Sequence, residues 1–152
     1  MKKYVKLFIL PIILLSVGSC KDNDGIIACP EIYVPLIANI KYLDNDGKDL
    51  IFADTPVYPP ESIKIYKTRP DDQPVPLMFT INKNAKFLAV NLEKVENGTF
   101  YIELKTGIKD KITYSAKIDG SIPCSDFKLI DIHQNDVPAQ YDDKNQVWIL
   151  QK

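Results

Sequence analysis

The chain has 152 residues, with 19 basic and 20 acidic side chains, a single histidine and three cysteines. Because lysines and acids are interspersed, the sequence lacks the concentrated basic surface that binds nucleic acid or anionic lipid. No Gly-x-Ser-x-Gly, Walker or His-Glu-x-x-His pattern occurs, and one histidine is too few for a multi-histidine metal site.

The first twenty residues, MKKYVKLFILPIILLSVGSC, have the features of a secretory signal peptide. Three lysines precede an apolar run from Leu7 to Leu15, which is shorter than the roughly 20 apolar residues needed to cross a bilayer. The segment ends in Val17-Gly18-Ser19-Cys20, which resembles the lipobox of bacterial lipoproteins. The resemblance implies that Cys20 carries a covalent lipid and that residues 1–19 are removed. An ordinary signal peptide with an incidental cysteine, or an uncleaved anchor, are the alternatives.

A lipid on Cys20 would attach the protein to a membrane, because two or more acyl chains anchor stably whereas one binds reversibly. The next residues, Lys21-Asp22-Asn23-Asp24, are similar to the charged export signal of surface lipoproteins in the Bacteroidota. A solvated tether would have the same composition. We therefore expect a tether at 20–30, a folded domain at 31–152, and a location on the outer membrane, facing either the periplasm or the cell surface.

Two cysteines, Cys29 and Cys124, remain for the folded part. Outside the cytoplasm two cysteines are expected to form a disulfide. In the chain-entropy model, a loop of about 100 residues would stabilise the fold by up to about 4.7 kcal/mol. Two free buried thiols, or half of a metal site, are the alternatives, although a single histidine makes a metal site difficult to complete.

Short segments with β-type alternation follow one another along the mature chain, while helical periodicity is nearly absent. In two of them we expect inward residues at Phe100, Ile102 and Leu104, and at every second position from Ile112 to Ile118. Turns are expected at Asp44–Gly47 and at Glu96–Gly98. The pattern predicts an all-β fold, a single antiparallel β-sandwich of about seven to nine strands. The expected strands are 32–43, 50–52, 62–67, 87–92, 99–104, 111–118, 127–132 and 147–150.

The stretch from Ile37 to Leu50 resembles the first hairpin of transthyretin-like (prealbumin-like) modules, where a strand enters an Asp-x-Asp-Gly turn and a leucine soon follows. It departs from that pattern afterwards, because residues 53–60 are a proline-rich loop. An immunoglobulin-like sandwich is the other possibility, although Trp148 lies after both cysteines and not between them.

Several polar groups could suggest chemistry, and each has a simpler structural interpretation. Asp44-Asn45-Asp46-Gly47 shares residues with calcium loops but lacks their full pattern, which favours a hairpin turn. Asp71-Asp72 and Asp142-Asp143 could suggest glycoside hydrolysis, but adjacent acids in such polar stretches are typical of exposed loops. We interpret His133 as a surface residue of a strand. The sequence therefore predicts no catalytic residues, no metal and no cofactor apart from the lipid.

Tyr66 and Tyr101 fall on the outward faces of their predicted strands and could form a flat platform for a sugar or a protein. Tyrosine is also a common strand residue without such a role. We therefore expect a non-enzymatic, lipid-anchored envelope protein that binds a protein or carbohydrate partner or supports an envelope assembly. The alternatives are a small carboxylate-dependent hydrolase, or an inhibitor or immunity-type protein that uses a protruding loop at Pro70–Pro76.

Overall fold

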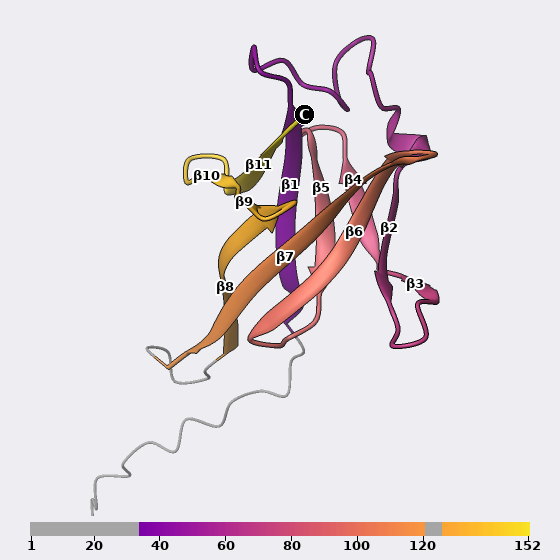
Figure 1. Ribbon diagram of the computed structural model, residues 1–152. Helices are drawn as coiled ribbons and strands as arrows, with labels where there is room; N and C mark the ends of the chain where they lie inside the picture. The colour runs from indigo at the N-terminus through magenta and orange to yellow at the C-terminus, as the bar shows by residue number, and fades with distance from the viewer. Residues whose placement is uncertain (1–33, 121–125) are drawn as a thin grey trace, which may run out of the picture. The chain divides into compact units, whose positions relative to one another are not determined.

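The computed structural model describes residues 34–120 and 126–152, which form two β-sheets packed face to face (Figure 1). The predicted β-sandwich is therefore confirmed. The predictions for Cys20, Cys29 and Cys124 lie outside the described residues and stay predictions. In the described ranges no helix is both long enough and apolar enough to cross a membrane.

The two sheets contain eleven strands in the described part of the chain. The five-stranded sheet has the order β10 (Gln140–Asp142), β11 (Val147–Gln151), β1 (Leu36–Leu43), β5 (Phe87–Leu92) and β4 (Phe79–Asn82). The six-stranded sheet has the order β3 (Pro74–Pro76), β2 (Lys64–Thr68), β6 (Asn97–Lys105), β7 (Ile108–Asp119), β8 (Asp126–Gln134) and β9 (Val137–Pro138). One 3-10 turn, η2 (Pro60–Ser62), precedes β2.

The core lies between the sheets and consists of the alternate residues of the long strands. In β6, Phe100, Ile102 and Leu104 are buried as predicted, while the residues between them face outward. β1 and β5 contribute in the same way, with every second residue from Leu36 and from Leu88 buried. Period-two burial of this kind removes one apolar face of each sheet from water, which is the main favourable term in folding.

The strand count and one strand direction differ from the prediction. The four additional strands, β3, β4, β9 and β10, have two to four residues each, too few to give a clear alternation. β11 runs parallel to β1, so the sandwich is not wholly antiparallel. A parallel neighbour far along the chain leaves no local signal in the sequence, because no hairpin turn joins the two strands.

The expected strand at Leu50–Phe52 is wrong, although the turn before it is confirmed. In that turn Gly47 has φ +78°, and Asp44 Oδ1 accepts hydrogen bonds from the backbone of the turn. Beyond an isolated bridge at Asp49, the backbone bends, because Asp49 Oδ1 accepts the N–H groups of Ile51 and Phe52 at 2.9 and 2.7 Å. Ile51 is buried in the core from this irregular loop.

The turn expected at Glu96–Gly98 lies earlier, because Asn97 and Gly98 already belong to β6. Gly98 pairs with Tyr114 of β7, and the Tyr114 ring lies directly over it. A glycine at this position leaves room for the ring, so it marks a close approach and not a turn.

Ile118 is 59% exposed and does not face the core as predicted. β6 begins at Asn97, which lies opposite Ser115 of β7. The residues of β7 after Ser115 therefore have a strand partner only in β8. The β7–β8 register also shifts between Ser115 and Ala116. This end of β7 therefore extends beyond the covered part of the sandwich.

Candidate functional site

The cross-strand register of the six-stranded sheet brings the two predicted tyrosines together. Tyr66 of β2 is directly opposite Tyr101 of β6. Their ring centroids are 5.6 Å apart with an angle of 21° between the ring planes. A groove with a volume of about 800 Å³ opens around them on the outer face of the sheet. The sequence predicted that both residues face outward; the pairing of β2 with β6 makes them neighbours.

The two rings, which the sequence suggested could form a platform, stack against each other. Rings lying side by side in one plane would keep their centroids farther apart, so this separation indicates offset stacking. From the β7 side, Lys109 Nζ lies 5.6 Å from the centroid of the Tyr101 ring. In the described part of the chain no hydrogen bond involves either tyrosine hydroxyl. The pair therefore offers two hydroxyl groups that have no hydrogen-bond partner among the described residues.

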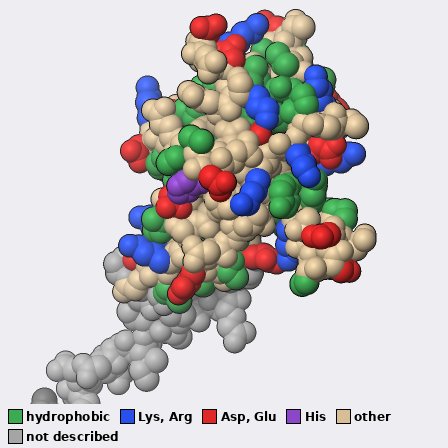
Figure 2. All heavy atoms as spheres, in the orientation of Figure 1, with side chains coloured by type: hydrophobic (Ala, Val, Ile, Leu, Met, Phe, Trp, Pro, Cys, Tyr) green, Lys and Arg blue, Asp and Glu red, His purple; other side chains and the backbone are tan. Residues whose placement is uncertain are grey.

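Charged side chains of both signs stand next to the tyrosine pair. Lys64, Glu103 and Lys109 form one cross-strand row across β2, β6 and β7, and all three line the groove. Within the described ranges none of them has an ion-pair partner closer than 4 Å. Figure 2 shows this face, where blue lysine side chains border a green hydrophobic patch. The charges beside the tyrosines are thus available to a ligand.

The outer edge of the sheet beside the groove is β3, and it cannot donate hydrogen bonds to an added strand at Pro74 or Pro76. The N–H of Leu77 donates to Ile65 O at 2.9 Å, and Gln73 O accepts from the N–H of Arg69 at 3.0 Å. Because backbone groups alternate in direction along a strand, residues 74 and 76 point away from β2, and proline has no N–H. This edge is therefore protected against strand addition.

The segment Pro70–Pro76, which was considered as a protruding inhibitory loop, is part of a hairpin. Its last three residues are β3, and the turn before them is closed by hydrogen bonds between Arg69 and both Gln73 O and the N–H of Asp72. Asp72 has φ +61°, the left-handed conformation that such a turn requires. The hairpin extends from the sheet beside the groove (Figure 1).

The predicted acid pairs do not form a two-carboxylate centre at the groove. Asp72 and Glu103 both line it, but Glu103 is opposite Lys64 at the start of β2, whereas Asp72 lies in the turn beyond Thr68, roughly 13 Å farther along at the rise of a strand. Two hydrolytic carboxylates would stand about 5–10 Å apart. Asp142 instead caps the β10–β11 turn through the N–H groups of Lys144 and Asn145.

A serine, a carboxylate and the histidine meet elsewhere on the same face, in the wrong order for nucleophilic catalysis. Ser115 Oγ donates to Asp131 Oδ1 at 2.8 Å, and His133 Nδ1 lies 4.0 Å from the same oxygen. A catalytic serine needs the imidazole as its immediate base, with the carboxylate behind it. Here the carboxylate lies between the two, so the serine has no base. No cluster of three or more His, Cys, Asp or Glu side chains within residues 34–120 and 126–152 could hold a metal ion.

Asp110 is a fully buried carboxylate that sequence reasoning missed. Tyr42 Oη and Gln134 Nε2 donate to its Oδ2 at 3.1 and 3.0 Å, and Asn135 Nδ2 donates to Oδ1 at 2.8 Å. Lys152 Nζ lies 2.5 Å from Oδ1. Burial, and then the negative charge of Asp110, raise the pKa of the Tyr42 hydroxyl well above its usual value.

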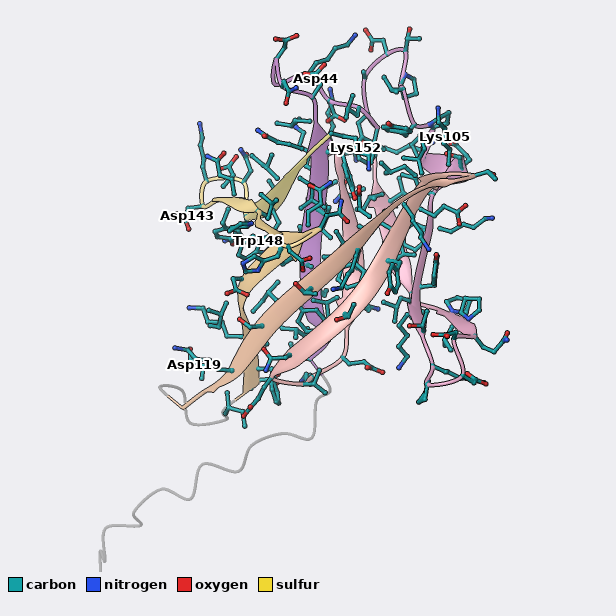
Figure 3. All side chains as sticks on the ribbon, viewed as in Figure 1. Asp44, Lys105, Asp119, Asp143, Trp148 and Lys152 are labelled. Atoms are coloured by element: carbon teal, nitrogen blue, oxygen red, sulfur yellow. The ribbon has the colours of Figure 1, made fainter. Side chains whose placement is uncertain are left out.

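This network has a structural role, because four donors occupy both carboxylate oxygens of Asp110 and leave no free oxygen for a ligand. It connects β1, β7 and the β8–β9 turn with Lys152, which lies beside the end of β1 (Figure 3). The parallel strand β11 is thereby held in place at its end.

A second cavity, of about 570 Å³, lies beside β1, β8 and β10–β11. Tyr141 and Trp148 meet there with ring centroids 4.7 Å apart. Figure 3 places Trp148 near β10 and β11, on the side of the molecule away from β2 and β3. Tyr141 is 42% exposed, so it is a natural comparison for the tyrosines of the first groove.

Comparisons with known proteins identify no relative: no family model, no curated protein and no solved structure matches the chain.

Proposed function

We propose that this protein is a non-enzymatic, lipid-anchored envelope protein that binds a partner through the tyrosine groove, defined as the groove around Tyr66 and Tyr101. The observation that carries the proposal is the meeting of these two tyrosines beside charged side chains that have no ion-pair partner within the described residues. Aromatic and charged groups that a fold leaves exposed and uncommitted are the usual components of a binding surface. A carbohydrate or a protein would both fit a groove of this composition.

The lipid anchor is tested separately from binding. Cys20→Ala should stay unlipidated and should not be cleaved by the lipoprotein peptidase, because the thiol is the site of acylation. Unchanged acyl labelling and cleavage of this variant would show that the lipobox interpretation is wrong.

Binding is tested by co-purification from gently solubilised membranes. A variant carrying Tyr66→Ala and Tyr101→Ala should lose the bound partner or glycan, while Tyr141→Ala, which removes an exposed tyrosine of the second cavity, should keep it. Circular dichroism of each variant should retain the strand spectrum. Equal recovery of the partner with all three proteins would place the binding surface elsewhere.

A further inference from the structure

We infer that the tyrosine groove binds an anionic polysaccharide, a chain whose sugars carry carboxylate or sulfate groups. The inference rests on the proposed function and names the class of ligand for the same groove. It depends on three features of the groove: its hydrogen-bond donors, its local charge and the chemistry of its edge.

At its tyrosine end, the groove carries hydrogen-bond donors and two positive charges beside an otherwise largely apolar lining. The hydroxyls of Tyr66 and Tyr101 have no hydrogen-bond partner in the described ranges, so each can donate to a ligand. Lys64 and Lys109 each add an ammonium group with three donors. Carboxylate and sulfate oxygens are acceptors only, so they match this set better than neutral hydroxyls, which must also donate.

The local charge is positive although the chain as a whole is slightly acidic, with a net charge of −1. Three lysines, Lys64, Lys109 and Lys111, face outward around the tyrosine pair, against two acids, Glu103 and the Asp136 that pairs with Lys111. Lys111 of β7 lies opposite Tyr101 in the β6–β7 register. Its Nζ is 3.7 Å from Oδ1 of Asp136, whose side chain is 81% exposed. Glu103 stands between two lysines, which offset its charge.

Asp72, the other acid of the groove, lies at the far end near the β2–β3 turn. The separation from the lysine row, roughly 13 Å along β2, exceeds the Debye length of about 8 Å at physiological ionic strength. Its charge is therefore largely screened at the lysine row, and the attraction for an anion is confined to the tyrosine end of the groove.

A polysaccharide fits this groove better than an acidic peptide because of the edge strand. Extended peptides gain much of their affinity by adding a strand to a sheet edge. Pro74 and Pro76 remove the outward N–H groups of β3, so the edge beside the groove cannot pair in this way. A polysaccharide needs no backbone pairing and can lie over the outer face of β2 and β6.

The test is titration calorimetry of the mature lipoprotein in non-ionic detergent. The probes are polygalacturonate and dextran sulfate, with neutral dextran and poly-glutamate as comparisons. Both anionic polysaccharides, or the one whose acid group fits, should bind, and the affinity should fall as salt is raised from 0.05 to 0.5 M because exposed charges are screened. Dextran and poly-glutamate should bind at least tenfold more weakly.

Four substitutions connect this binding to the groove. Lys64→Ala and Lys109→Ala should each weaken it by about three- to fivefold, the range of an exposed charge pair. Lys117→Ala, on β7 but at the opposite end of the sheet, should leave it unchanged. Lys109→Arg should retain most of the affinity, because the charge is kept.

The failures of the two proposals are distinguishable. Equal binding of dextran, or tighter binding of poly-glutamate, with loss of binding in the tyrosine variant would overturn the anionic polysaccharide and keep the groove as the binding surface. Binding of anionic polysaccharides that neither the lysine nor the tyrosine variants weaken would reject the groove itself. Absence of binding to every probe, while membrane co-purification still depends on the tyrosines, would reject this ligand class only.

Discussion

Gly98→Ala should destabilise the protein by about 3 kcal/mol, because the added methyl group has no space. An ideal Cβ at residue 98 would lie 2.2 Å from Cζ and 2.3 Å from Oη of Tyr114, far inside van der Waals contact. The Tyr114 ring is buried next to Phe100, with centroids 6.2 Å apart, and its hydroxyl donates to Glu93 O at 2.9 Å. The ring must therefore leave its position.

The magnitude follows from what the displaced ring loses. Losing the hydrogen bond to Glu93 costs about 1 kcal/mol. Overpacking, with the shift of ring and backbone, costs a further 1–3 kcal/mol or so. A loss of about 3 kcal/mol would be a large part of the roughly 5–15 kcal/mol stability of an ordinary domain.

Urea denaturation followed by circular dichroism measures this loss. Gly120→Ala is the matched control, because a Cβ at residue 120 meets nothing within 4 Å. Tyr114→Leu should make Gly98→Ala nearly neutral, since the clashing ring atoms are gone, and the double-mutant cycle should show a coupling of about 2 kcal/mol or more. A midpoint for Gly98→Ala within error of the parent would refute the close packing of Tyr114 over Gly98.

Three further predictions concern the charged and titrating groups. Asp110→Ala should cost about 3 kcal/mol in urea denaturation, because it leaves buried donors unpaired, whereas Lys117→Ala should change the stability by less than about 0.5 kcal/mol. The raised pKa of Tyr42 stabilises the folded state below the unfolded pKa of 10.0, and this contribution is lost as the pH rises above it. The stability difference between the parent and Tyr42→Phe should therefore shrink as the pH rises above about 10, and a constant difference would contradict the assignment. The hydrogen bond from Lys94, followed by that from the Phe127 backbone, holds the pKa of Asp126 below 3.8, so NMR titration of Lys94→Ala should show that pKa rising toward its ordinary value.

The sequence by itself determined the sandwich, because burial of one face of each long strand imposes a period of two. Alternating apolar residues predicted β5 and β6 nearly to their ends, and the inward side of each. It also determined the Asp44–Gly47 turn, since an aspartate that accepts from its own turn and a glycine at positive φ are local requirements. These features depend on residues that are close together along the chain.

Only the tertiary structure decided which strands are neighbours, and the candidate site depends on that choice. Tyr66 and Tyr101 were each expected to face outward, but their contact requires β2 to pair with β6 in one particular register. The same pairing gathers Lys64 and Lys109 on a chain whose overall charge gave no sign of a positive surface. Asp110 illustrates the same limit, because its donors come from Tyr42 in the first strand and from Lys152, which follows the last strand. Strand pairing is set by the packing of the whole core, which no local pattern of residues encodes.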